Sequence, residues 1–190
     1  MAGFNRNFPA IKASLTANEP EVRVAALGAA WRSGLLTPEN ILPFFSDPSD
    51  DVRYRAVELS PRLKDNEGLA PALVLLLRQP ELAEVAAFAL GELGVTTDDV
   101  VTALSNQAVD HDEPLCRESA VAALGALGCG RQAVLAATKD IATVRRRAVL
   151  CLAVFEGPDI DAALSSALND RDWQVRQAAE DLLGPASSTE

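Results

Sequence analysis

A short sequence frame recurs six times along the chain and constrains the fold more than any other feature. In the segment 115–128, LCRESAVAALGALG, Ala lies three residues after Arg117, Leu seven residues after it, and Gly eight and eleven residues after it. The frame begins at positions 23, 53, 83, 117, 145 and 176, with Ala83 in place of Arg in the third copy. A period of about 31 residues is typical of repeat proteins, whose units stack and share a continuous core.

Each copy of the frame is predicted to form a helix, which we call helix B of its repeat. Its apolar residues recur at offsets 3, 4, 7, 10 and 11 from the start of the frame, and these offsets share one face of an α-helix. Proline and acidic residues precede most copies, as in Asp47-Pro48 and Glu113-Pro114, and both favour a first helical turn. A shorter apolar segment before each B helix is predicted to be helix A, over residues 8–15, 41–45, 69–77, 100–104, 134–137 and 160–168. The chain is therefore predicted to be all-α, with about six helix pairs.

The frame Val-Arg-x-x-Ala-Ala-x-x-Leu-Gly after an acidic turn resembles the short HEAT-like repeats of phycobilisome-lyase-type proteins. The resemblance covers nearly the whole chain, residues 5–184. It implies a right-handed α-solenoid in which the B helices line the concave face and the A helices the convex face. We therefore expect a single HEAT-repeat domain over residues 1–184 and a disordered polar tail over residues 185–190. HEAT-like repeats occur in scaffolds, adaptors, lyase subunits and a few enzymes, so this fold alone does not name a function.

Charge and composition favour some classes of partner over others. The chain carries 17 Lys and Arg against 27 Asp and Glu, a net charge of -10, which disfavours binding to nucleic acid or to an anionic membrane. The longest nearly apolar stretch, residues 69–77, is about half of a membrane span, and the N-terminus has no apolar run typical of a signal peptide. The 3 cysteines are an odd number without CxxC spacing, so we expect neither disulfides nor zinc. We therefore expect the protein to be located in the cytoplasm.

The arginines of the frame are predicted to be structural rather than ligand-binding. They are Arg23, Arg53, Arg117, Arg145 and Arg176. Their position shares the helical face of the buried Ala and Leu residues, and Asp47 and Asp170 lie six residues before Arg53 and Arg176, where HEAT-like repeats usually have an acidic partner. We expect a ladder of charge-assisted Arg–Asp hydrogen bonds that ties successive turns together. Because the acidic position is Ala17, Leu77, His111 or Lys139 in other copies, the ladder is predicted to be incomplete.

No residue pattern typical of catalysis is found. His111 is the only histidine of the sequence. It lies in an acidic connection, where we expect its side chain to be solvated and to have no functional role. Cys116 and Cys151 occupy apolar positions and are predicted to be core residues, whereas Cys129 follows Gly128 in a turn. HEAT-like hydroxylases that bind two irons carry several His-Glu pairs, which this chain lacks. We therefore expect no metal, no cofactor and no enzymatic activity.

The surface opposite the buried stripe is the predicted binding site. Offsets 2, 5 and 9 of each B helix should face the groove, and the residues selected there are Arg55, Glu58, Arg62, Val85, Phe88, Glu92, Ala122, Arg147, Leu150 and Val154; Gly28 and Ala178 share these offsets. The middle copies are mostly apolar at these offsets, and an apolar patch rimmed by charge is typical of a partner site. The same pattern also fits a groove that is simply filled by alanine side chains, or a groove that closes on itself or on a second copy of the chain.

The function predicted from these residues is a non-enzymatic scaffold or adaptor that binds a protein or a peptide on its concave face. The alternative is a subunit or chaperone of a bilin lyase system, which would handle a tetrapyrrole and its carrier protein. Co-purification of one protein without pigment would favour the scaffold, and a visible absorption band after mixing with bilin would favour the alternative.

Overall fold

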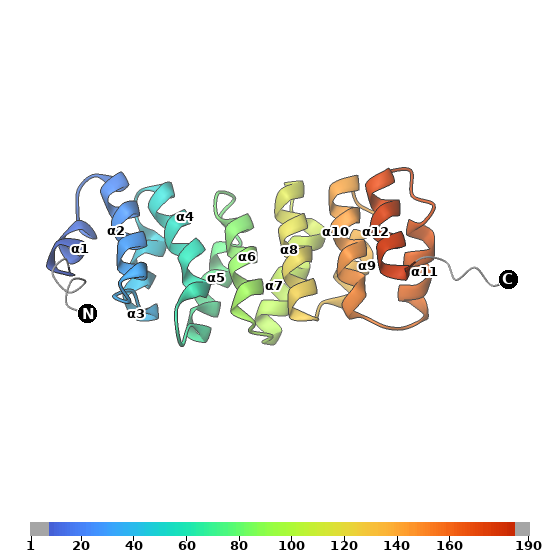
Figure 1. The fold of residues 1–190 in the computed structure, drawn as a ribbon, viewed down its shortest axis with the longest axis horizontal. Helices are drawn as coiled ribbons and strands as arrows, with labels where there is room; N and C mark the ends of the chain where they lie inside the picture. The colour runs from blue at the N-terminus through green and yellow to red at the C-terminus, as the bar shows by residue number, and fades with distance from the viewer. Residues whose placement is uncertain (1–7, 185–190) are drawn as a thin grey trace. The chain divides into compact units, whose positions relative to one another are not determined.

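The computed structural model describes residues 8–184 and is all-α: helices and turns, with no strand in that range. The chain divides into two compact units, residues 1–93 and 94–190. The first contains α1 (Phe8–Ser14), α2 (Pro20–Arg32), α3 (Pro38–Ile41), α4 (Asp50–Leu59), α5 (Ala70–Leu76) and α6 (Ala83–Leu93), with 3-10 turns η2 (Leu42–Ser46), η3 (Ser60–Arg62) and η4 (Glu67–Leu69). The second contains α7 (Asp98–Asp110), α8 (Pro114–Leu127), α9 (Arg131–Ala137), α10 (Ala142–Cys151), η5 (Leu152–Val154), α11 (Pro158–Ala167) and α12 (Trp173–Leu183). Figure 1 shows these helices with their labels.

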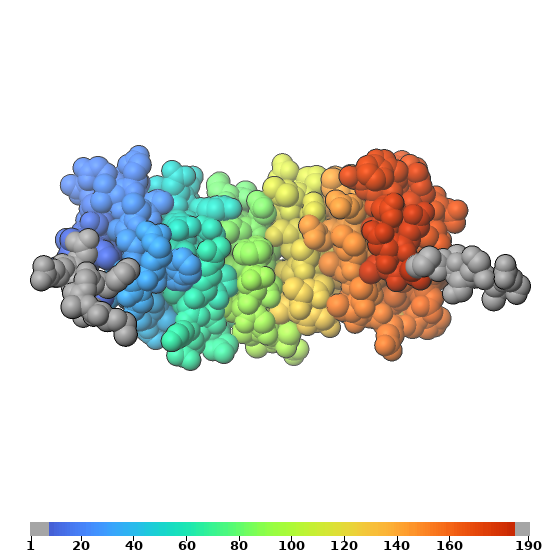
Figure 2. Space-filling model, in the orientation of Figure 1, coloured from blue at the N-terminus to red at the C-terminus, as the bar shows by residue number. Residues whose placement is uncertain are grey.

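The helices pack in consecutive pairs, as the sequence frame predicts. In the first unit, α1 packs on α2, η2 on α4, and α5 on α6, while α4 contacts both α2 and α6. In the second unit, α7 packs on α8, α9 on α10, and α11 on α12, while α10 contacts both α8 and α12. Figure 2 shows side chains filling the space between neighbouring helices within each unit. The prediction of six helix pairs is confirmed, whereas the handedness and the single continuous domain stay predictions.

The alanine three residues into each frame explains how closely these helices approach. Ala26, Ala56, Ala86, Ala120, Ala148 and Ala179 are all buried. Gly125 of α8 gives a second close contact, because a β-carbon at this position would lie 2.4 Å from Sγ of Cys151 in α10. Small residues at these positions therefore set the spacing between consecutive B helices within each unit.

The helix ends follow from the local sequence. Pro20, Pro38, Pro114 and Pro158 each begin a helix, where the missing N–H group is not needed. The Asp172 carboxylate accepts hydrogen bonds from the backbone N–H groups of Gln174 and Val175 and so caps α12. Gly128 ends α8 with φ 63°, a left-handed conformation that favours glycine. The predicted tail, residues 185–190, lies outside the described residues.

Among the helices of residues 8–184, none is long and apolar enough to cross a bilayer.

Candidate functional site

The frame arginines join neighbouring repeats through bidentate contacts. Arg145 donates from Nε and Nη2 to the two carboxylate oxygens of Asp170, at 2.8 and 2.7 Å. Arg117 binds Asp140 in the same way, at 2.6 and 2.7 Å, and Arg23 of the first unit binds Asp47 at 2.9 and 2.6 Å. The Arg23, Arg117 and Arg145 contacts form the Arg–Asp ladder: each arginine reaches the turn that precedes the next B helix.

The remaining guanidinium nitrogen of each ladder arginine holds the turn before its own helix. Nη1 of Arg145 donates to the carbonyl oxygen of Asp140 at 2.7 Å, and Nη1 of Arg117 donates to that of His111 at 2.7 Å. Each arginine therefore fixes two turns at once, which makes it a structural residue. The backbone N–H of Asp172 also donates to the Asp170 carboxylate, at 2.8 Å.

Two details of the ladder differ from the sequence expectation. The Asp47 carboxylate, expected beside Arg53, accepts from Arg23, and Arg53 instead donates to the Asp47 carbonyl oxygen at 3.0 Å and to the Asp50 side chain. The copy that begins at Arg145 is expected to lack an acid because residue 139 is Lys, but Asp140, one residue later, supplies the carboxylate. The ladder is thus continuous through the second unit, and the shifted acid is tolerated because the turn before α10 is one residue shorter.

The ladder contacts perturb the ionisation of their carboxylates. The hydrogen bonds from Arg23, Arg117 and Arg145 lower the pKa of Asp47, Asp140 and Asp170 respectively, against the opposing effect of burial. The same contacts raise the pKa of Arg145 above its ordinary value. These groups are charged across the physiological range and are already paired, so they offer no free ligand site.

The predicted groove residues of the first unit are largely occupied by one another. Glu58 forms ion pairs with Arg55 at 2.5 Å and with Arg62 at 3.8 Å. The Arg62 guanidinium carbon lies 5.6 Å from the centroid of the Trp31 ring, a cation–π contact. Phe88 on α6 is 47% exposed, and Glu92 is exposed as well. Glu58 therefore holds Arg55 and Arg62 in one local cluster.

Three residues at the predicted groove offsets do not face solvent. Val85 is only 4% exposed and packs in the core of the first unit, so its assignment to the groove is wrong. Gly28 and Ala178 are buried too. Gly28 is covered by a side chain, since a β-carbon there would lie 3.0 Å from Nη2 of Arg55. In the copies that begin at positions 53, 83, 145 and 176, offset 1 is more open than offset 2, whereas in the first copy Ala25 at offset 2 is exposed.

The second unit presents an open face over α8, α10 and α12, which we call the α10 surface. It consists of two adjoining hollows of about 70 and 90 Å³ lined by Glu118, Thr143, Arg146, Arg147, Leu150, Trp173, Gln174, Gln177, Ala178 and Asp181. Arg146 and Leu150 line both hollows. Leu150 is 36% exposed and Trp173 is 63% exposed, so apolar side chains are open to solvent on both α10 and α12. Of the predicted groove residues, Ala122 is half-buried and Val154 is exposed, but neither lines these hollows.

The charges of the α10 surface are only partly compensated. Nη2 of Arg147 lies 3.3 Å from Oε1 of Glu118, and Nε2 of Gln177 donates to Asp181 at 2.8 Å. Arg146 is exposed and forms no ion pair with any residue of the described range. An uncompensated guanidinium in the same hollow as two exposed apolar side chains can receive a carboxylate from a partner.

Arg146 and Trp173 are not among the residues that the sequence pattern selects. Arg146 lies at offset 1 and Trp173 lies three residues before its frame arginine, outside the selected offsets 2, 5 and 9. A signal for this face is present in the sequence, because residues 143, 146, 147 and 150 follow the helical spacing of one face.

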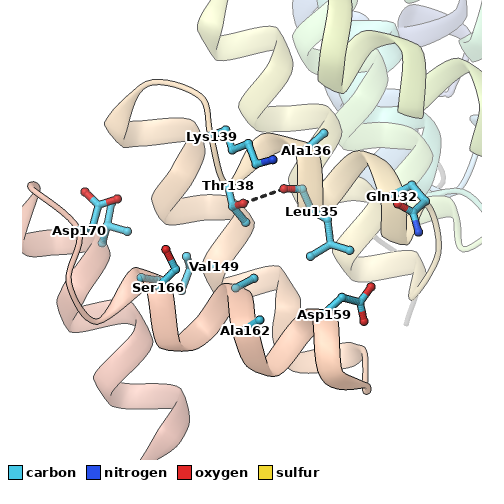
Figure 3. A pocket seen from close by; sticks show the side chains of 13 residues that line it. Gln132, Leu135, Ala136, Thr138, Lys139, Val149, Asp159, Ala162, Ser166 and Asp170 are labelled. Carbon is cyan, nitrogen blue, oxygen red and sulfur yellow. Dashed lines mark hydrogen bonds between the residues drawn. The ribbon is translucent and has the colours of Figure 1, made fainter.

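A larger cleft of about 530 Å³ lies between the A helices α9 and α11. Figure 3 shows Leu135 pointing toward α11, with Ala162 and Ser166 on the opposite wall. Val149 and Val175 contribute an apolar floor, and the Asp170 carboxylate at one end is already bound to Arg145. Asp159 at the rim is paired with Arg131. The cleft offers small apolar contacts, and Lys139 at its edge is exposed and forms no ion pair with any residue of the described range. No sequence pattern indicates this cleft.

The histidine and cysteines carry no assembled chemistry. Nδ1 of His111 accepts the backbone N–H of Glu113 at 3.1 Å in an exposed turn. Cys116 is buried, as predicted, whereas Cys151 is only partly so; burial raises the pKa of Cys151 and of Cys129. Within residues 8–184, no group of three or more His, Cys, Asp or Glu side chains is arranged to hold a metal ion.

No family model and no curated protein sequence matches the chain. Among solved structures, the chain is similar to human deoxyhypusine hydroxylase in complex with glycerol, with 16% sequence identity and a TM-score of 0.39. That similarity covers 91% of this chain and 82% of the hydroxylase chain. The fold described above rests on the observed helix pairs themselves.

Proposed function

We propose that the protein is a non-catalytic scaffold of the HEAT-like, phycobilisome-lyase-type repeat class and that a protein partner docks on the α10 surface. The observation that carries this proposal is that unpaired Arg146 lines the same hollow as exposed Leu150 and exposed Trp173. Trp and Arg are enriched among the residues that contribute most to protein–protein affinity. The 3 cysteines are free, which fits a reducing compartment, and we place the scaffold in the cytoplasm.

The chemistry of this surface defines the partner segment. An apolar side chain would enter the hollow between Leu150 and Trp173, and an adjacent carboxylate would pair with Arg146. The chain has a net charge of -10, so an acidic partner is repelled by most of the protein and is attracted to this local site. Nucleic acid and membranes lie outside this proposal for the same electrostatic reason.

The test is affinity capture from the native host with quantification by mass spectrometry. Leu150→Asp should remove the captured partner, because it places a carboxylate in the apolar contact and beside the acid of the partner. Leu75→Asp is the matched control, since Leu75 is 63% exposed on α5 of the first unit and should capture the partner normally. Equal capture by both variants would contradict the proposal, and a visible absorption band on mixing with bilin would favour the chromophore-handling alternative.

A further inference from the structure

The outer edge of α12 carries the positions that earlier B helices bury against their neighbours. At offsets 4 and 7 of the frame, α8 has Val121 and Leu124, and the α10 copy has Val149 and Leu152; all four are buried. In α12 the same offsets are Glu180, which is exposed, and Leu183, which is 50% exposed. The edge of α12 is therefore an unpaired helix-packing face within the described part of the chain.

Arg176 has an unused hydrogen-bonding edge on this face. The Nη1 atom of Arg176 donates to the carbonyl oxygen of Asp170 at 2.7 Å. The other frame arginines make the same kind of contact, each with a carbonyl oxygen of the turn before its own helix. Arg117 and Arg145 use Nε and Nη2 to bind an aspartate of the next turn, but Arg176 binds no carboxylate of residues 8–184. A carboxylate from another chain would complete the ladder contact at this position.

The spacing of the exposed residues on α12 is self-complementary. Trp173, Arg176, Glu180 and Leu183 follow one another at intervals of three, four and three residues, which places them on one stripe of the helix. If two such helices pack antiparallel about a two-fold axis level with residue 178, position 173 faces 183 and position 176 faces 180. Apolar then meets apolar and Arg meets Glu, twice each by symmetry.

We propose that α12 is a homodimer interface, in which Arg176 of one copy pairs with Glu180 of the second copy and Trp173 packs against its Leu183. The helix has 11 residues and is about 16 Å long, so the contact is small and the dimer is expected to be weak. The two symmetric ion pairs then mainly set the antiparallel orientation, and the Trp–Leu contacts supply most of the buried apolar area.

Charge reversal tests this pairing by sedimentation equilibrium over a wide protein concentration range. Glu180→Arg and Arg176→Glu should each weaken the dimer at least about tenfold, because like charges then face each other twice. The double variant Arg176→Glu with Glu180→Arg should recover the dimer, since the swapped charges again meet. An equimolar mixture of the two single variants should form a heterodimer more readily than either variant forms a homodimer.

Two controls show whether the dimer depends on this helix face and on a folded chain. Glu92→Arg makes the same charge change on the exposed face of α6 and should leave the dimer constant unchanged. Circular dichroism should show the same helix content in every variant. A wild-type protein that stays monomeric up to about 1 mM, or a dimer that Glu180→Arg does not weaken, would overturn the proposal.

This proposal does not depend on the proposed scaffold function. Neither Arg176 nor Glu180 lines the α10 surface, whereas Trp173 borders both faces. Loss of dimer with intact partner capture, and loss of capture with intact dimer, are therefore separate outcomes of the two sets of variants.

Discussion

Replacing Asp170 by Asn should expose how much the Arg–Asp ladder stabilises the second unit. The carboxylate accepts from Nε and Nη2 of Arg145 and from the backbone N–H of Asp172, at 2.7–2.8 Å. The two side chains are only 7% and 14% exposed, for Arg145 and Asp170 respectively. Asn keeps the size of the side chain and one oxygen, but it removes the charge and turns an N–H group toward the guanidinium.

The magnitude follows from the burial of the pair. Exposed ion pairs contribute about 0.2–1 kcal/mol, and breaking a fully buried pair costs about 3–5 kcal/mol. The Arg145–Asp170 pair lies closer to the buried case, so Asp170→Asn should lower the free energy of unfolding by about 2–3 kcal/mol. Urea titration followed by far-UV circular dichroism measures this difference, with the slope of the transition checked for a change in cooperativity.

Asp159→Asn is the matched control, because Asp159 also pairs with an arginine but its side chain is 47% exposed. Solvent screens that pair, so the control should lose much less stability than Asp170→Asn. The Arg131–Asp159 contact also uses Nε and Nη2, so the two pairs differ mainly in burial. Equal losses in the two variants would refute the argument that burial makes the ladder a stabilising element.

Four further predictions concern the ladder carboxylates, two close helix contacts and His111. The free energy of unfolding should fall as the pH drops below about 4, because arginine contacts lower the pKa of the ladder carboxylates in the folded state. The stabilisation is complete above the pKa of the same carboxylates in the unfolded chain, and it is lost as the carboxylates of the folded protein protonate. Acid titration should show a smaller loss of stability in Asp170→Asn than in the wild type. Gly125→Ala should lower stability by about 1–3 kcal/mol in urea titration, since its β-carbon would lie 2.4 Å from Sγ of Cys151, and an unchanged midpoint would contradict the close approach of α8 and α10. Ala148→Leu should cost a similar ~1–3 kcal/mol at a fully buried position, whereas His111→Ala should leave the thermal midpoint almost unchanged.

The repeating frame makes the helix pairs predictable, because offsets such as those of Ala120 and Ala148 are buried by the period of the helix itself. Pairing between repeats is harder to predict. A fixed spacing of six residues between acid and arginine points to Lys139 in the copy that begins at Arg145, and so it predicts no acid there. The turn in this copy is one residue shorter, and the carboxylate of the next residue, Asp140, binds Arg117.

The exposed face depends on small rotations of each helix that the period does not define. Val85 and Phe88 are assigned to the same face by their offsets, but only Phe88 is exposed, because α6 turns Val85 into the core. Trp173 lies at the first residue of α12, where the helix start rather than the frame decides its exposure. The cleft between α9 and α11 depends on the separation of two A helices, and no local residue pattern encodes that separation.

Site-specific photo-cross-linking tests the proposed docking site most directly. A photoreactive amino acid in place of Gln177, which is exposed on the α10 surface, should cross-link the captured partner. The same substitution at Gln132, which is exposed at the α9–α11 cleft, is the matched control and should give no cross-link. A partner cross-linked from position 132 and not from position 177 would contradict the assignment of the α10 surface as the binding site.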